Sequence, residues 1–331
     1  MEWNDNMDLK KILKYNYKFL LFIILLCLFF YLKLPYYVMA PGGTINITDR
    51  VNLSGYEETN GSINMLYVSE YKATPGLYLY SMIMGYDIIK NNDRKISNES
   101  IKEVEDRNKI MRDNSLDVAL MVAYTKANKF IKINNKRNVI IATTQNNGLK
   151  VGDIILEVDN TLVEDVSTIK KIINNKKEND TITFKILRDG KEKEIKSKIY
   201  LENNTKIVGV VIITDYDYEI EPKLEIKFRD SESGSSGGLM LTLTIYNALV
   251  NEDIIKGRKI SGTGTIAFDG SVGEIDGIKY KIMGAASDKM DIVFVPSSNY
   301  EEAIATKNKY HYDMDIIKVD TFDEVLDYLK K

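Results

Sequence analysis

The longest run of apolar positions lies near the start of the chain. Residues 19–32, "FLLFIILLCLFFYL", carry no charge. Continued through Met39, the run reaches the roughly 20 residues that cross a bilayer as a helix. Lysines dominate before it, so the positive-inside rule predicts a cytoplasmic tail at 1–18, a transmembrane anchor at 19–39 and the remaining chain outside the cell membrane. A cleaved signal peptide is the alternative, although the "VMA" before Pro41 is a poor cleavage context.

The next segment, residues 40–128, has a mixed pattern. Its start, "APGGTINITD", is typical of a turn followed by a strand. Its end, 99–128, is rich in helix formers and has apolar residues at helical spacing from Leu116 to Ala127. We expect an extracellular N-terminal region at 40–128 that packs with the rest, in which this helix serves packing alone.

Residues 129–199 show the alternation of a small β-rich unit. Two strands are predicted at 138–144 and 153–160, followed by a short helix at 165–175 that Asp165 can cap. The segment 181–196 alternates cleanly around Asp189-Gly190, the signature of a tight hairpin. A spacer without a ligand is the plain interpretation of this unit.

A glycine-serine loop, "GSSGGLM" at 234–240, opens an apolar helical stripe in the last segment, 200–331. Stepping back along the stripe places Ser236 in the first turn of a buried helix, facing inward. Gly234 and Gly237 let the backbone approach a substrate, and free N–H groups at a helix start can hold an oxyanion. A plain linker and a loop that binds phosphate or a small anion remain open alternatives.

A lysine lies on a second apolar stripe. The segment 261–299 predicts a strand, a hairpin at Asp269-Gly270, a strand, a helix and a strand. In that helix Lys281 shares a face with apolar residues, and burial would lower its pKa and favour the neutral amine, which can act as a general base for Ser236. The alternative is that Lys281 extends past its neighbours into water.

Composition narrows the chemistry. The net charge of −3 offers no basic surface for nucleic acid. The single cysteine, Cys27, and the single histidine, His311, allow neither an internal disulfide nor a Cys/His zinc site. We therefore expect no metal and no cofactor, and a base other than histidine for any serine nucleophile.

These segments resemble known families. The words "LKVGDIILEVDN" and "ILRDGKEKE" resemble a PDZ domain, which implies capture of an extended peptide by strand addition. The glycine-serine loop followed by "GTGTIAFDGSVGEIDGIKYKI" resembles the proteolytic domain of Lon-type proteases, which use a Ser-Lys dyad. The resemblance implies an α/β (α+β) fold, Ser236 and Lys281 as catalytic residues, and Thr263 beside the lysine. From about residue 34 the chain is similar to PDZ-containing, membrane-anchored Lon-like serine proteases of Gram-positive bacteria.

The nucleophile loop departs from the pattern of that family at three positions. Ser235 stands where the family has proline, Gly237 where it has alanine, and Ser233 where it has glycine. The added flexibility can loosen an oxyanion hole, and Ser235 is a competing nucleophile. An inactive enzyme therefore stays among the alternatives.

The sequence predicts a membrane-anchored extracellular serine endopeptidase that cleaves extended secreted peptides or segments of surface proteins. The chain has no Walker loop, so we expect no ATP-driven unfolding. One rival is a catalytically inactive, membrane-tethered PDZ scaffold that binds peptides. Another is a carboxy-terminal processing protease, which predicts a different motif order around the PDZ domain. Membrane lipid is the expected partner of the N-terminal helix, and homo-oligomerisation is left open.

Overall fold

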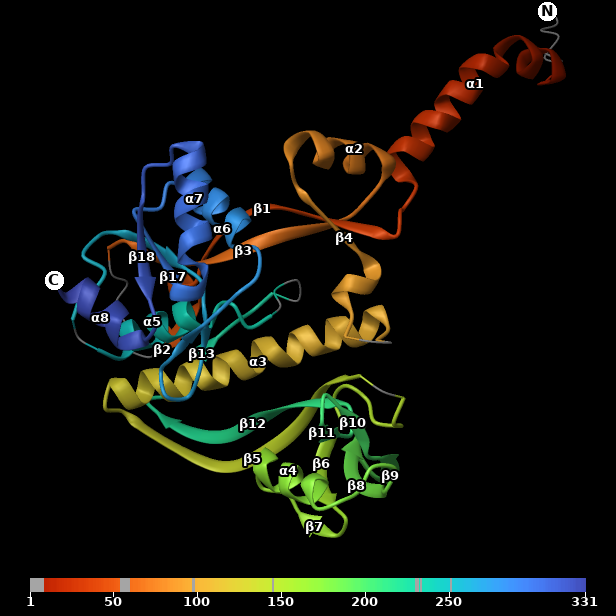
Figure 1. Ribbon diagram of the computed structural model, residues 1–331. Coiled ribbons are helices and arrows are strands. Elements are labelled where there is room, and N and C mark those ends of the chain that lie inside the picture. The colour runs from red at the N-terminus through yellow and green to blue at the C-terminus, as the bar shows by residue number, and fades with distance from the viewer. Residues whose placement is uncertain are drawn as a thin grey trace, which may run out of the picture. The chain divides into compact units, whose positions relative to one another are not determined.

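The computed structural model of the protein describes residues 9–53, 60–96, 99–144, 146–229, 232, 234–250 and 252–331 (Figure 1). The chain divides into two compact units, one of residues 1–40 with 69–94 and one of residues 41–68 with 95–331. Strands β1 (Tyr36–Asn46) and β3 (Ser62–Lys72) run through both units. Ser233, one of the three departures in the nucleophile loop, lies outside the described residues.

The smaller unit consists of helices joined to a two-stranded pairing. It contains α1 (Leu9–Tyr31), α2 (Pro75–Met84), the 3-10 helix η2 (Asn91–Arg94) and β4 (Asp87–Lys90), which pairs antiparallel with the first residues of β1. Thr74 caps α2 by accepting a hydrogen bond from the N–H of Leu77 at 3.3 Å, and Gly85 ends the helix in the left-handed conformation.

The transmembrane helix expected at 19–39 is not found. Among the described helices, none combines the length and the apolar character needed to cross a membrane. The helical part of the expected span ends at Tyr31, because Leu34 precedes a proline and is thereby disfavoured from helical geometry. Residues 36–39 pair with β4 instead.

The larger unit holds a mixed sheet in the order β18-β17-β14-β3-β1. Its parallel pairs join β3 to β14 (Lys259–Gly262) and β14 to β17 (Ile292–Pro296), and β17 to β18 (Asp315–Val319). The region expected at 40–128 thus supplies two strands to the sheet of the C-terminal segment, which sequence periodicity alone did not predict. The helices of this part are α5 (Gly238–Leu249), α6 (Ile278–Ser287), α7 (Tyr300–Tyr310) and α8 (Phe322–Lys330). Its short elements are η1 (Thr48–Arg50), β2 (Val51–Leu53), β13 (Leu224–Ile226), β15 (Thr265–Ile266), β16 (Val272–Gly273) and η3 (Ser297–Asn299).

A second sheet has the order β12-β5-β6-β8-β9, with β7 added to β6. Its elements are β5 (Phe130–Thr143), β6 (Ile154–Val158), β7 (Thr161–Leu162), α4 (Val166–Asn174), β8 (Thr181–Arg188), β9 (Lys191–Lys198) and β12 (Val210–Glu221). A hairpin of β10 (Tyr200–Glu202) and β11 (Thr205–Ile207) leads into β12. The predicted cap of Asp165 on α4 and the hairpin at Asp189-Gly190 are confirmed. Because β12 pairs along β5, the sheet continues beyond residue 199.

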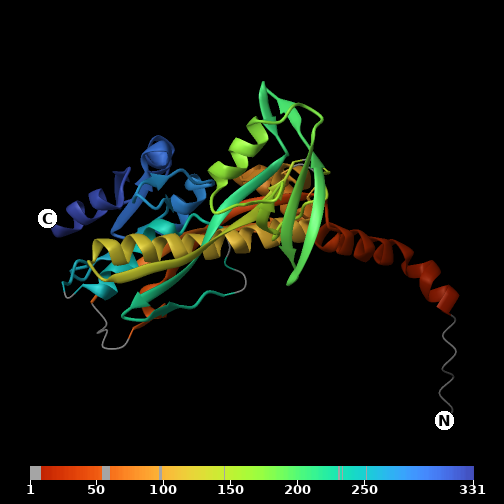
Figure 2. The ribbon, with the colours of Figure 1, turned by 90° about the horizontal axis from the view of Figure 1, so that it is seen from below.

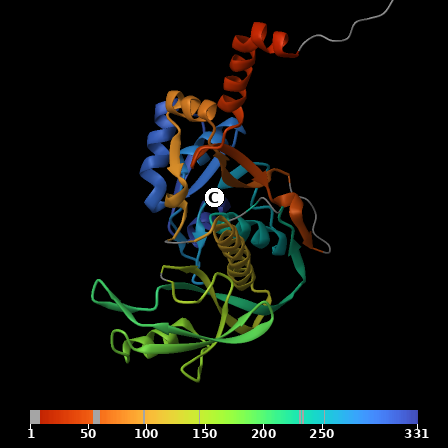
Figure 3. The ribbon, with the colours of Figure 1, turned by 90° about the vertical axis from the view of Figure 1, so that its right-hand side faces the viewer.

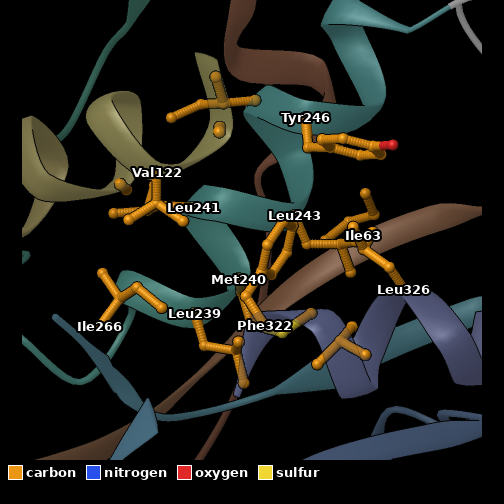
Figure 4. Packing of buried hydrophobic residues seen from close by; sticks show 14 of the residues in the cluster. Ile63, Val122, Leu239, Met240, Leu241, Leu243, Tyr246, Ile266, Phe322 and Leu326 are labelled. Carbon is orange, nitrogen blue, oxygen red and sulfur yellow. The ribbon is translucent and has the colours of Figure 1, made fainter. Parts of the chain in front are cut away.

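The long helix α3 (Ile101–Lys126) contacts both halves of the larger unit. It packs against α5 on one side and against β5 and β12 on the other (Figures 2 and 3). A capping box of Ser100 and Glu103 begins it. The residues of α5 are all buried, and they form the main core with side chains of α3, α8 and β3 (Figure 4).

Candidate active site

The lysine predicted as a general base is buried. Lys281 lies on α6 with 3% of its surface exposed, so the alternative in which it extends into water is wrong. Burial lowers the pKa of Lys281 to about 8, and the negative charge of Asp276 opposes part of that change. A substantial fraction of the amine is therefore neutral near pH 8, which is the form that can accept a proton.

Thr263 connects the lysine to the nucleophile loop. Lys281 Nζ donates a hydrogen bond to Thr263 Oγ1 at 3.0 Å, and Thr263 Oγ1 donates to the carbonyl oxygen of Ser236 at 3.0 Å. The N–H of Gly264 donates to the same carbonyl at 2.8 Å. These contacts fix the backbone of Ser236, not that of Ser235, next to the lysine. Within the described residues, no direct hydrogen bond joins Ser236 Oγ to Lys281 Nζ, a separation common in enzymes without substrate.

The serine itself lies just before the helix. α5 begins at Gly238, with Gly237 as its cap, so the predicted start at Ser236 was two residues too early. Ser236 is half-buried. The difference arises because the N–H of Gly238 closes a tight turn onto the Ser235 carbonyl at 3.2 Å, which leaves Ser236 at the mouth of the helix.

The backbone N–H groups at this mouth differ in their partners. The N–H of Leu239 donates to the Gly264 carbonyl at 3.1 Å, and that of Gly238 is engaged in the turn. In the part of the chain that the structure describes, no acceptor receives the N–H of Ser236 or Gly237. Unpartnered N–H groups at a helix start are the donors that can stabilise an oxyanion.

Close packing explains the glycines that follow the serine. A Cβ added to Gly237 would lie 2.0 Å from Met65 Sδ, and one added to Gly238 would lie 2.7 Å from Ser115 Oγ. Met65 of β3 thus occupies the space that an alanine at 237 would need. Gly234 adopts the left-handed conformation, with φ of 86°, which suits glycine in this turn.

The helix α3 holds the nucleophile loop, a role that its sequence pattern did not predict. Ser115 Oγ donates to the Ser235 carbonyl at 3.2 Å, and the N–H of Gly234 donates to the Asn108 carbonyl at 3.0 Å. Arg112 Nη1 donates to the Glu232 carbonyl at 3.0 Å. The helix predicted to pack without chemistry of its own therefore also supports the backbone of the nucleophile loop. The polar residues of α3 that face the loop were the available signal, but they cannot be told from solvent-exposed positions without the fold.

Arg50 completes the support of this loop. Its Nη1 lies 2.8 and 2.7 Å from the two carboxylate oxygens of Glu232, and both side chains are largely buried. His311 lies elsewhere, exposed at the end of α7. The site therefore consists of Ser236, Thr263 and Lys281, with supporting contacts from α3 and from the start of the chain's larger unit.

Comparison with known proteins identifies two domains. Residues 118–199 match the PDZ domain family, and residues 230–330 match the Lon protease (S16) C-terminal proteolytic domain, a serine protease domain with a Ser-Lys dyad. The protein therefore combines a PDZ domain with a Lon-type proteolytic domain in a mixed α/β fold.

Individual relatives are similar to parts of the chain. The chain is 29% identical over 100 residues to a Lon protease of Mesomycoplasma hyopneumoniae, covering 30% of this chain and 11% of that protein. It is 28% identical over 109 residues to the archaeal Lon protease of Halobacterium salinarum, covering 32% of this chain and 15% of that protein. A stretch of 71 residues is 44% identical to an HtrA-like serine protease of Staphylococcus aureus, covering 19% of this chain and 9% of that protein.

The matches span only a small part of each curated relative, between 9% and 15% of its length for the three named here. Among solved structures, the PDZ domain of an SdrC-like protein from Listeria monocytogenes is similar, with a TM-score of 0.23 and 18% identity, covering 25% of this chain and 93% of that one.

Proposed function

We propose that the protein is a serine endopeptidase in which Ser236 is the nucleophile and Lys281 the general base. The observation that carries the proposal is the buried lysine amine, whose pKa is lowered to about 8 and which is linked through Thr263 to the carbonyl of Ser236. A desolvated lysine beside a serine at a helix mouth is the arrangement that a Ser-Lys hydrolase needs.

The chemistry follows from these positions. Ser236 Oγ attacks the scissile carbonyl while the neutral amine of Lys281 accepts the hydroxyl proton. The N–H groups of Ser236 and Gly237 stabilise the oxyanion. The resulting lysine ammonium donates a proton to the leaving amine, and water then hydrolyses the acyl-enzyme by the same route. Thr263 is a positioning residue, because its hydroxyl holds the Lys281 amine and the backbone of Ser236 in place.

The PDZ domain supplies substrate binding. Its sheet ends in β12 on one side and β9 on the other, and an extended peptide binds such domains by adding a strand to an edge. We propose that the substrate is an extended peptide or an exposed protein segment, cleaved without ATP. Attachment to the cell membrane with the catalytic domain outside stays a prediction, which cell fractionation and surface protease accessibility test directly.

The test uses the full chain in mild detergent with a pool of unstructured peptides, read by mass spectrometry. Ser236→Ala and Lys281→Ala should abolish cleavage, whereas the matched control Ser235→Ala should retain it. Below about pH 8, kcat/KM should rise tenfold per pH unit and then level off, because only the neutral lysine is active. The inactive scaffold is the second candidate, because the nucleophile loop has Ser235 and Gly237 where the family has proline and alanine. Peptide binding without cleavage by the wild-type chain would support that scaffold.

A further inference from the structure

The helix α2 buries a polar side chain and exposes large apolar ones, which is the opposite of a surface helix in water. Ser81 is its one fully buried residue, with 0% exposed, and its hydroxyl donates to the Leu77 carbonyl at 2.6 Å. Large apolar side chains are exposed instead, with Ile83 at 83%. The exposed set is Leu79, Tyr80, Met82, Ile83 and Met84. Surface helices in water bury the apolar face and expose the polar one. The exposed face of α2 therefore suits apolar surroundings.

The sequence around α2 has the features of a membrane interface. No charged residue occurs from 73 to 86, and Lys72 and Asp87 bound the stretch. Tyrosine rings lie in pairs beside the helix, with Tyr80 and Tyr86 centred 6.1 Å apart. The guanidinium of Arg94 lies 4.0 Å from the ring of Tyr37. Tyrosines together with long cationic side chains are enriched at the level of lipid headgroups.

The neighbouring helix α1 distinguishes lipid from a protein partner. Every residue from 21 to 26 is exposed and apolar. Because successive residues are turned by about 100°, six in a row point in all directions around the helix. A protein partner covers one face of a helix, whereas lipid chains surround it. The Phe29 ring packs on Gly76, where an added Cβ would lie 2.7 Å from Phe29 Cε1, so α1 and α2 meet (Figure 1).

We propose that α2 is a lipid-contacting helix that lies in the membrane interface, with α1 beside it in the same apolar environment. With 10 residues, α2 is roughly 15 Å long, about half of the ~30 Å hydrocarbon layer, so it lies in the interface and does not cross the layer. The inference uses none of the catalytic residues and is independent of the proposed proteolysis.

Charge predicts which lipid property matters. In the segment 69–94, three acidic residues balance three basic ones, namely Glu70, Asp87 and Asp93 against Lys72, Lys90 and Arg94. A balanced segment gains little from anionic headgroups, so burial of apolar area drives the contact. Insertion of α2 should therefore occur in neutral as well as in anionic vesicles, and the lysines at 10, 11, 14 and 18 of the same unit can add attraction only to the anionic ones.

Spin labelling of the full-length chain tests this inference. Cys27 is the single cysteine, so a Cys27→Ser background accepts one label at a chosen position. A nitroxide at Ile83→Cys is compared with one at Leu162→Cys, which is 73% exposed on β7. The probes are vesicles of phosphatidylcholine with and without phosphatidylglycerol. Collision with oxygen and with a water-soluble nickel chelate reports the surroundings of each label.

The label at 83 should favour oxygen over the nickel chelate at least severalfold in both kinds of vesicle, and the label at 162 should show the reverse. A label at Met84→Cys repeats the measurement if the first variant folds poorly. Nickel accessibility at 83 equal to that at 162 overturns the proposal. Protection at 83 that persists in detergent and grows with protein concentration also overturns it, because a second copy of the chain is then the occupant.

Discussion

The two side chains proposed as catalytic, Ser236 and Lys281, are supported in different ways. Lys281 lies within the regular helix α6, donates a hydrogen bond to Thr263 and is almost completely buried. Ser236 lies on a glycine-rich loop that is held by contacts from α3, from Arg50 and from the stretch that follows β14. The comparison shows that one half of the dyad is fixed by local structure and the other by distant segments. Variants should therefore affect the two halves by different routes.

The largest effect is expected for the lysine. Lys281→Met should lower kcat/KM by roughly 10²–10⁴-fold, the usual contribution of a general base. The same change should stabilise the fold, because the buried amine disfavours the charged form. The folded-state pKa of about 8 lies below the unfolded value of 10.5, so the penalty is full below pH 8 and disappears as pH rises through 10.5.

That penalty is on the order of 3 kcal/mol. Urea unfolding at pH 7 and at pH 10.5 measures it, and the gain in stability of Lys281→Met should shrink at the higher pH. Lys279→Met is the matched control on the same helix, since Lys279 is not fully buried. A stability gain that does not depend on pH would contradict the assignment of the penalty to Lys281.

A smaller effect is expected where α3 supports the serine. Arg112→Ala removes a charge-assisted hydrogen bond to the Glu232 carbonyl, worth about 1.5–3 kcal/mol, and should lower kcat/KM by about tenfold or more. The pH dependence should stay unchanged, because the lysine is untouched. Lys109→Ala, an exposed position on the same helix, should leave kcat/KM as it is. A shift of the pH profile in Arg112→Ala would show that the two halves are not independent.

The packing of Met65 against Gly237 gives a sharper test of the loop. Gly237→Ala should lower kcat/KM about fivefold, because the new methyl group would clash with Met65 Sδ. The methionine side chain is flexible, so we expect the low end of the cost of overpacking, ~1 kcal/mol. Met65→Ala in the same chain should restore most of the loss. A double-mutant cycle with no coupling between the two positions would show that the glycine is needed for its flexibility and not for space.

The smallest effect concerns the electrostatics of the lysine. Asp276 is exposed and raises the pKa of Lys281 in part, so Asp276→Asn should move the rise of kcat/KM to slightly lower pH. The shift should shrink in high salt, because water and ions screen an exposed charge. Glu274→Gln, an exposed acidic neighbour, is the control and should leave the profile in place. A shift toward higher pH in Asp276→Asn would reverse the sign of the argument.

The sequence predicted the lysine more accurately than the serine, for a physical reason. The stripe around Lys281 is a local pattern of period 3.6, and the helix α6 begins at Ile278, where that stripe begins. Likewise, a hairpin at Asp189-Gly190 depends only on neighbouring residues. The contacts by which α3 holds the nucleophile loop join residues more than 100 positions apart, such as Ser115 and Ser235. No periodicity encodes such contacts.

The N-terminal segment shows the same limit in another form. Hydropathy predicted a membrane segment around residues 19–32 but none at α2, because an apolar stretch as short as α2 resembles a core helix in sequence. Only the burial of Ser81 and the exposure of Ile83 reveal which way that helix faces. The pairing of β3 with β14 was missed because parallel pairing of distant strands leaves no local signal.

The parallel pairing of β3 with β14 also has a consequence for how the protein folds during its synthesis. Ser62 pairs with Lys259, and the whole PDZ segment lies between them in the chain. During synthesis the edge of β3 that pairs with β14 stays unpaired until nearly 200 further residues have left the ribosome. The nucleophile loop gains its Thr263 contact only after that. The proposed pair of Ser236 and Lys281 can therefore assemble only late in synthesis, after both β14 and α6 have been made.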